Sequence, residues 1–320
     1  MIQEKIIQKK GKSIQKYRRV ESPSSINTFK QCPRKYYYAY ILNLPVLDNI
    51  HTIMGSIVHK TLEEFFKVNP HFINKELYRD ELRFILLDIF NTNWKKKFDR
   101  INELCSNPYR VSHYYSECVF MVDSWVGNFF KELDSKMEHT GFIDAFKQIV
   151  PKTEAEFRSE EFGVRGFIDA IYDSAEEIRI IDYKTSNKRE ITPEYKLQLA
   201  IYALLYQEKH GKMPGKVGIN FLKHGIQYID VDDELLNLAK SEVEVMHINT
   251  MEGGIESYQM KPGPLCRWST GQCDFYGICF EGKNPDELKK NDEENKNNEE
   301  LKKMANEYSE KKYTNSPNDF

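Results

Sequence analysis

Residues 164–184 read VRGFIDAIYDSAEEIRIIDYK, and this stretch decides the fold that we expect. The segments Val164–Tyr172 and Ile178–Tyr183 are rich in β-branched and aromatic residues, which is typical of strands. Between them lies a short polar run that is typical of a turn. The stretch therefore predicts a β-hairpin with its turn near Ala175.

Two acids and a lysine lie in this hairpin. The turn would place Asp169 beside Ile181 and Asp182, because opposed side chains on paired strands are only about 5 Å apart. Side chains alternate along a strand, so Asp182 and Lys184 share a face. Converging carboxylates beside an amine are typical of metal-dependent hydrolysis, and we expect a divalent cation at this end of the sheet.

The segment after the hairpin predicts a helix. Thr192-Pro193-Glu194 supplies a capping threonine, a proline at the first helical position and an acid against the positive end of the helix dipole. The helix should end near Lys209, before Gly211. Gln198 and Tyr202 lie four residues apart and can present an amide and a phenol together, although core packing explains Tyr202 equally well.

Further strands complete a small sheet on either side of the hairpin. We expect one at Thr153–Phe157 and two at residues 216–221 and 226–231, followed by a helix at residues 233–249. Glu154 and Glu156 share a face of the first of these strands. Either can reach the metal site, and an exposed strand face explains both as well.

The region before the hairpin reads as helical. Residues 22–31 begin with serines and a proline, Gly55 is expected to open a second helix, and long amphipathic helices are expected at about 74–102 and 113–136. His59 would then lie in a first helical turn and aim at a site in front of the helix. Glu63, four residues on, can orient its ring.

Three of the six cysteines are concentrated near the end of the chain. Cys266, Cys273 and Cys279 are separated by six and five residues, and three thiolates form an incomplete tetrahedral set that Cys32 can complete. Six cysteines in 320 residues are too few for a disulfide scaffold. We expect Cys105 and Cys118 to be buried or idle thiols.

Charge is distributed unevenly along a chain whose net charge is −3. Residues 1–40 carry ten Lys/Arg and two Glu, so this end suits a polyanionic partner, although solvated lysine-rich termini are common. The run Arg34–Tyr40 combines bases with tyrosines, which suits nucleic acid but also a buried helix face. No apolar run resembles a signal peptide or a membrane span, and we expect a cytoplasmic protein.

Taken together, these motifs resemble the RecB-type nucleases of the PD-(D/E)xK superfamily. The resemblance is closest to the branch with a [4Fe-4S] cluster, as in AddB-type subunits and CRISPR adaptation exonucleases. It covers Ser22 to Phe280 and rests on six motifs in the same order: residues 24–36, 55–59, 166–169, 182–184, 198–202 and the three late cysteines. One departure is the spacing of Cys266 and Cys273, which has six intervening residues where the family usually has two.

The resemblance implies a role for each matching residue. It implies that His59, Asp169, Asp182 and the backbone carbonyl of Tyr183 bind Mg²⁺ or Mn²⁺. Lys184 would be the motif lysine that activates water and stabilises developing charge. Gln198 and Tyr202 would position the site and DNA. The cysteines that would bind a structural cluster are Cys32, Cys266, Cys273 and Cys279.

The expected fold class is α/β, with a restriction-endonuclease-like core, a helical insertion and a C-terminal iron–sulfur segment. The expected boundaries are a basic arm at 1–21, a nuclease domain at 22–280 with the insertion at about 70–150 and the iron–sulfur segment at 262–280, and a charged tail at 281–320.

The expected activity is exonuclease cleavage of single-stranded DNA or duplex ends in repair, recombination or defence. Unwinding would come from a partner helicase. Two alternatives stay open: a non-catalytic DNA-binding or scaffold subunit, and a Zn²⁺ protein with the same four cysteines.

Overall fold

The computed structural model describes residues 17–289, apart from 106, 175, 252 and 269–270. Most of the expected basic arm (1–16) and of the charged tail (290–320) lies outside the described residues. The chain divides into two compact units, one within residues 1–27 and 48–252 and the other within 28–47 and 253–320. The division falls inside helix α1 (Pro23–Gln31).

The first unit is built on a mixed five-stranded sheet with the order β1-β2-β3-β4-β5. All neighbouring strands are antiparallel except β3 and β4, which are parallel and joined through helix α7. This is the α/β class expected from the sequence, and it is consistent with a restriction-endonuclease-like fold. The strands are β1 (Lys152–Ser159), β2 (Val164–Asp173), β3 (Ile178–Lys184), β4 (Lys216–Phe221) and β5 (Gly225–Asp230).

The predicted hairpin is confirmed as β2 and β3. Ala170 pairs with Ile181 and Ile171 with Ile180, and Asp169 and Asp182 are the next residues beyond this paired register, close enough for their charges to interact. The expected proximity of the two acids is therefore correct. The Tyr183 N–H, next to Asp182, donates a hydrogen bond of 2.7 Å to Asp169 Oδ2.

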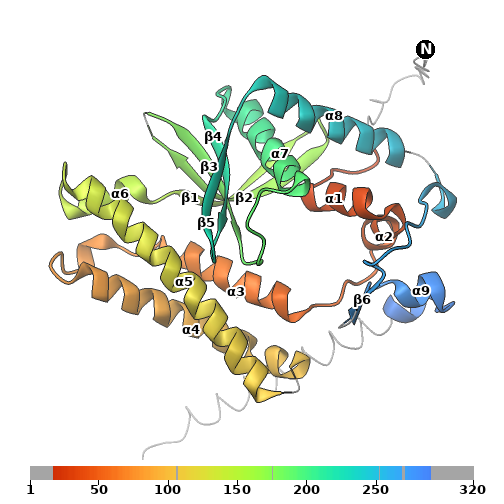
Figure 1. Ribbon diagram of the computed structural model, residues 1–320. Helices are drawn as coiled ribbons and strands as arrows, with labels where there is room; N and C mark the ends of the chain where they lie inside the picture. Colours follow the sequence, from red (N-terminus) through yellow and green to blue (C-terminus); the bar gives the residue numbers. More distant parts are fainter. Residues whose placement is uncertain (1–16, 106, 175, 252, 269–270, 290–320) are drawn as a thin grey trace, which may run out of the picture. The chain divides into compact units, whose positions relative to one another are not determined.

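Helix α7 (Pro193–His210) covers one face of the sheet and contacts β1 to β4, and α8 (Asp233–Thr250) packs on α7 (Figure 1). The ends of α7 are those expected: Thr192 caps the first turn, and Gly211 ends the helix in the left-handed conformation, with φ of 66°. Nine residues of α7 are buried. A helix buried on most sides places its few polar side chains inside the molecule, where they need partners.

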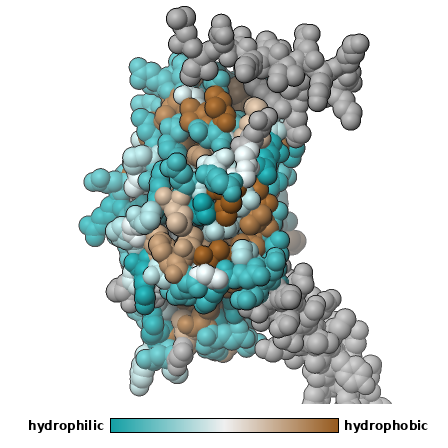
Figure 2. Space-filling model, turned by 90° about the vertical axis from the view of Figure 1, so that its right-hand side faces the viewer, coloured by the Kyte–Doolittle hydropathy of each residue, from teal (hydrophilic) through white to brown (hydrophobic). Residues whose placement is uncertain are grey.

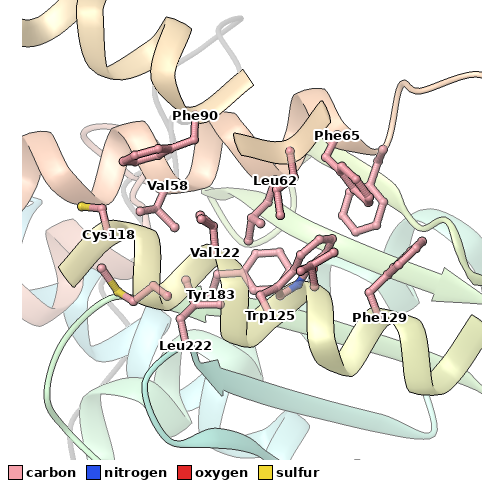
Figure 3. Packing of buried hydrophobic residues seen from close by; sticks show 14 of the residues in the cluster. Val58, Leu62, Phe65, Phe90, Cys118, Val122, Trp125, Phe129, Tyr183 and Leu222 are labelled. Carbon is pink, nitrogen blue, oxygen red and sulfur yellow. The ribbon is translucent and has the colours of Figure 1, made fainter. Parts of the chain in front are cut away.

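Four helices lie on the other side of the sheet (Figure 1). Their apolar faces form one core with Ile181, Tyr183 and Leu222, which includes several edge-to-face aromatic pairs such as Phe65 with Trp125 (Figure 3). The two long helices expected from the sequence are present. The four are α3 (Ile50–Phe65), α4 (Tyr78–Leu104), α5 (Pro108–Met137) and α6 (Phe142–Ile149), with a short 3₁₀ turn at Pro70–Phe72.

The expectation that a helix opens at Gly55 is wrong. Helix α3 begins at Ile50, because Asn49 and Thr52 form a capping box there. Gly55 is an interior residue at a close approach, since a Cβ on it would lie 3.5 Å from Thr185 Oγ1. His59 therefore lies in the middle of α3 and not in a first turn.

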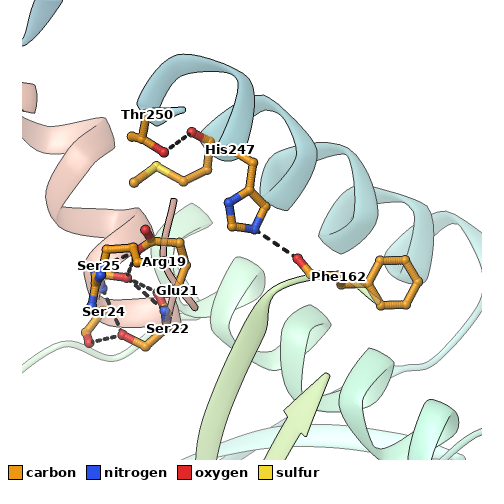
Figure 4. A network of polar contacts seen from close by, with 9 residues as sticks. Arg19, Glu21, Ser22, Ser24, Ser25, Phe162, His247 and Thr250 are labelled. Carbon is orange, nitrogen blue, oxygen red and sulfur yellow. Dashed lines mark hydrogen bonds and ion pairs between the residues drawn. The ribbon is translucent and has the colours of Figure 1, made fainter. Parts of the chain in front are cut away.

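A buried glutamate fixes the start of the described chain to the sheet (Figure 4). The Glu21 N–H donates to Gly163 O, and the Arg165 N–H donates to Glu21 O, each at 2.8 Å. The Glu21 carboxylate accepts hydrogen bonds from Ser25 Oγ at 2.6 Å and Arg19 at 2.8 Å, which compensate for its burial. These bonds hold the residues before α1 against the beginning of β2.

The second unit has a small core of Tyr38, Leu44 and Phe275. Tyr36 stacks on Tyr258 and Tyr37 also contacts it, so these tyrosines pack inside the unit, as the buried-face interpretation predicted. Its elements are α2 (Pro33–Tyr36), a π-helical turn (Tyr37–Ile41), a 3₁₀ turn (Ile255–Ser257), β6 (Arg267–Trp268), β7 (Gly271–Gln272) and α9 (Tyr276–Phe280).

No helix among the described residues has the length and apolar character needed to span a membrane. On the face shown in Figure 2, hydrophilic residues surround several separate apolar areas.

Candidate functional site

Three potential metal ligands converge where β1, β2 and α3 meet. One ligand atom each from His59, Glu154 and Asp169 lies within 4.8 Å of the others. His59 Nδ1 is 3.4 Å from Asp169 Oδ1, while Asp169 Oδ2 accepts the Tyr183 N–H. The two oxygens of Asp169 thus have separate tasks, one fixing the carboxylate and the other facing the imidazole.

Glu154 reaches this group through an unusual backbone conformation. It has φ of 48°, in the left-handed region that non-glycine residues rarely adopt. The register places it opposite Asp169, yet the ladder is regular only on either side of it. The sequence does not distinguish Glu154 from Glu156 as a ligand, and among the described residues only Glu154 joins the group of potential metal ligands.

Asp182 and Lys184 form a buried ion pair next to these ligands. Lys184 Nζ lies 2.7 Å from Asp182 Oδ2, and the aspartate side chain is 3% exposed. Asp182 Oδ1 accepts a hydrogen bond of 2.8 Å from the Gln198 amide. Within the described part of the chain Oδ2 has no partner besides the Lys184 ammonium, so a further lone pair on it remains able to bind a cation.

The ionisation of these groups is coupled through their charges. Burial raises the pKa of Asp182, and the Lys184 ammonium opposes that shift. Burial lowers the pKa of His59, but its hydrogen bond to Asp169 and the charges of Asp169 and Asp182 outweigh burial, so the net shift is upward. Burial and the charge of Asp169 also raise the pKa of Glu154. The acids repel one another, and a divalent cation would relieve that repulsion.

Gln198 and Tyr202 lie on α7 and form one wall of the site. The Gln198 amide nitrogen donates both to Asp182 Oδ1 and to Tyr202 Oη, each at 2.8 Å. The Tyr202 ring lies directly over Gly166, where a Cβ would be 2.8 Å from Tyr202 Cε1. The glycine before Phe167-Ile168-Asp169 is therefore needed so that the tyrosine can approach the strand.

We expect Gly166→Ala to destabilise the protein by about 1–3 kcal/mol, because the added methyl overlaps a ring that a buried helix holds in place. Urea unfolding followed by circular dichroism measures this loss. Gly127→Ala is the matched control, since nothing lies within 4 Å of a Cβ built on Gly127. It lies inside α5, where alanine should be neutral or stabilise by up to about 1 kcal/mol. Equal stability of the two variants would contradict the packing explanation.

The prediction that Glu63 orients His59 is wrong. The Glu63 carboxylate instead pairs with Lys60 at 2.7 Å and Lys67 at 2.5 Å along the outside of α3. The carboxylate against the His59 ring comes from Asp169, on a strand that is distant in sequence. Spacing within the helix alone could not indicate this.

The donor set fits a hard divalent cation. Carboxylate oxygens dominate it, and such ligands suit Mg²⁺ or Mn²⁺, with one imidazole favouring the softer Mn²⁺. The buried Asp182 carboxylate and the crowded acids beside it provide the negative charge that such a cation needs.

The four cysteines named from the sequence line one cavity of about 100 Å³ in the second unit. Cys266 and Cys273 are backbone neighbours, since the Cys273 N–H donates to Cys266 O at 2.9 Å. The six residues between them include the paired strands β6 and β7, which fold out as a small hairpin. The unusual spacing thus leaves the two cysteines adjacent.

Burial raises the pKa of two thiols in this cavity, those of Cys273 and Cys279. Burial, and then the charges of Cys273 and Cys32, raise the pKa of Cys279 to about 11. Binding of iron or zinc would favour the thiolates, because metal coordination displaces thiol protons. Cys105 and Cys118 are buried in the helical core of the first unit, as expected of idle thiols.

Comparison with known proteins identifies a family, and it finds solved structures that are similar to the chain. A model of the PD-(D/E)XK nuclease superfamily matches residues 21–319. The chain is similar to a crystal structure from Eubacterium rectale named as a "putative exonuclease", with 14% identity over 82% of this chain and 93% of that chain and a TM-score of 0.40. No curated protein matches the chain.

Proposed function

Because this chain belongs to the PD-(D/E)XK nuclease superfamily, we propose that it is a divalent-metal-dependent exonuclease that hydrolyses single-stranded DNA or DNA ends. The observation that carries the proposal is the convergence of Asp169, Asp182 and Lys184 at one end of a mixed sheet, next to His59 and Glu154. The half-buried lysine and the intact acids favour catalysis over a purely structural role.

The metal ligands in this proposal are His59, Glu154, Asp169, Asp182 and the backbone carbonyl of Tyr183. A bound Mg²⁺ or Mn²⁺ supplies positive charge that polarises the scissile phosphate and acidifies a coordinated water. Hydrogen bonds within the chain orient the two acids: the Tyr183 N–H fixes the Asp169 carboxylate, and the Gln198 amide fixes that of Asp182.

Lys184 is the proposed acid–base and electrostatic residue. Burial lowers its pKa, but the charge and the hydrogen bond of Asp182 and the charge of Asp169 together outweigh burial, so the pKa is raised and the side chain stays an ammonium at neutral pH. Tyr195 provides an aromatic ring 5.1 Å from its Nζ, which favours the cation further. An ammonium held in this way can orient water and stabilise the charge that develops on a phosphate. Gln198 and Tyr202 act in the proposal as positioning residues for Asp182.

We also propose a structural [4Fe-4S] cluster on Cys32, Cys266, Cys273 and Cys279. The shared cavity and the adjacency of Cys266 and Cys273 support it. Residues 28–47 and 253–289 are distant in sequence, and a metal bound by both closes a very long loop. Such a cluster would support a nuclease domain at 22–280, with the insertion at about 70–150 and the segment 262–280 as expected from the sequence. The proposed role of the nuclease in repair, recombination or defence, with a helicase partner, follows from the resemblance to RecB-type nucleases.

The test is digestion of end-labelled linear and circular DNA, single- and double-stranded, with Mg²⁺, Mn²⁺ or EDTA. The proposal predicts loss of linear substrates from their ends only when a divalent cation is present, and survival of circles. Cleavage of closed circles would show an endonuclease, and no metal-dependent cleavage of any substrate would leave a binding or scaffold subunit.

We expect Glu154→Gln to weaken Mn²⁺ binding by about tenfold or more, because the amide removes one charge from the ligand group. Isothermal titration with Mn²⁺ measures this directly, without DNA. Glu156→Gln is the matched control, two residues along the same strand and outside the group of potential metal ligands. Equal Mn²⁺ affinity of the two variants would exclude Glu154 as a ligand.

A further inference from the structure

An aromatic side chain is exposed on the strand that carries Asp169. Phe167 is 51% exposed, although its neighbours Gly166 and Ile168 are buried. It lies two residues from Asp169, so about 7 Å of strand separates them. A single exposed apolar residue is ordinary on a protein surface, and its position beside the metal site is what gives it significance.

The orientation of Phe167 follows from its neighbour. Gly166 faces α7, because its missing Cβ is replaced by the ring of Tyr202. Side chains alternate along a strand, so Phe167 points away from α7. Arg165 and Phe167 on β2, and their partners Arg158 and Glu156 on β1, are all exposed. The paired strands β1 and β2 therefore present an open strip of exposed side chains here, and this strip leads to Glu154 and Asp169.

The charged side chains of this strip differ in whether they already have a partner. Arg158 is held by Glu160 at 2.5 Å. Within the described part of the chain no carboxylate pairs with the Arg165 guanidinium, which remains able to bind an anion. Glu156 lies directly opposite Phe167 and disfavours a phosphate beside the ring. An anion is thus attracted to Arg165, while an uncharged flat group suits Phe167.

We propose that Phe167 stacks on an unpaired base of the substrate and that Arg165 binds the neighbouring phosphate, so that the site selects single-stranded DNA. This inference rests on the proposed nuclease function and specifies its substrate. An unpaired base can offer its face to an aromatic ring, whereas bases within a duplex are stacked on each other. The ring would hold the strand as its scissile phosphate reaches the acids.

The experiment measures fluorescence anisotropy of labelled single-stranded and hairpin-closed duplex DNA on the full chain, with Ca²⁺ in place of a catalytic cation. We expect Phe167→Ala and Phe167→Leu to weaken single-strand binding by about 5- to 100-fold, and Phe167→Tyr to retain it. Duplex binding should change little. Phe120→Ala, which removes a 57% exposed phenylalanine from α5, is the matched control.

The salt dependence separates stacking from phosphate binding. Arg165→Gln should reduce the slope of log affinity against log salt by about 0.7, as expected for one lost phosphate contact on a single strand. Phe167→Ala should leave the slope unchanged.

The outcomes separate this inference from the proposed function. Metal-dependent cleavage by the wild type together with unchanged single-strand binding by Phe167→Ala would overturn the stacking inference alone. An equal loss on both DNA forms would overturn the selection of single strands. A wild type that neither binds nor cleaves DNA would overturn both.

Discussion

Asp169→Asn is expected to reduce metal-dependent DNA cleavage by at least about a hundredfold. The asparagine can still accept the hydrogen bond from Tyr183 N–H through its oxygen, so the strand ends should stay in register. It loses the negative charge that faces His59 and that lies within 4.8 Å of Glu154. The divalent cation would then be bound weakly. Initial rates on end-labelled DNA, measured for both proteins over a range of Mn²⁺ concentrations that includes the wild type's optimum, give the effect.

The matched control for this variant is Asp173→Asn. Asp173 lies at the end of the same strand and accepts a hydrogen bond from Tyr206, away from the metal ligands. Its replacement should leave the cleavage rate within about twofold, since distant sites act independently. Unchanged cleavage by Asp169→Asn, in a variant that unfolds at the same temperature as the wild type, would exclude this acid from the chemistry.

Under the proposed cluster assignment, Cys273→Ser is expected to abolish metal binding by the four cysteines and to lower the unfolding temperature by several degrees. A loss of 2 kcal/mol corresponds to roughly 4–8 °C for a domain of moderate size, and a broken structural metal site costs at least this much. Protein prepared without oxygen should be coloured and contain iron and sulfide in the wild type. In the variant both should fall, as measured by visible absorbance, metal analysis and calorimetry.

Cys105→Ala provides the control for cysteine replacement in general. Cys105 is buried at the end of α4 and lies outside the cavity that the four cysteines line. This variant should keep its colour and iron. A colourless wild type that contains zinc would contradict the iron–sulfur assignment, while a coloured Cys273→Ser variant would show that Cys273 is not a ligand.

Local sequence signals were sufficient for the elements that carry the site. Alternation and a polar turn predicted the β2–β3 hairpin, and the pairing of Ala170 with Ile181 confirms the expected approach of Asp169 to Asp182. The cap at Thr192 and the glycine at 211 gave both ends of α7. These signals work because strand pairing and helix capping depend on residues close together in the chain.

Two expectations failed where a different local partner was present. A helix start is expected at Gly55, whereas the capping box at Asn49 starts the helix at Ile50 and leaves Gly55 in its interior. Helix spacing predicts that Glu63 contacts His59, but Lys60 and Lys67, the latter beyond the end of α3, pair with Glu63. The acid that does lie against His59 is Asp169, on a distant strand that no local signal can indicate.

The sequence by itself determined that two acids, a lysine and a glutamine belong to one strand pair and one helix, and it predicts a set of four cysteines, which line one cavity. Only the tertiary structure decided that Glu154 faces Asp169, that Tyr202 occupies the space left by Gly166, and that a hairpin folds Cys273 back to Cys266. The physical reason is that the effect of a left-handed residue, a missing Cβ or a strand pair depends on the atoms packed against it. The sequence encodes these features without showing their neighbours.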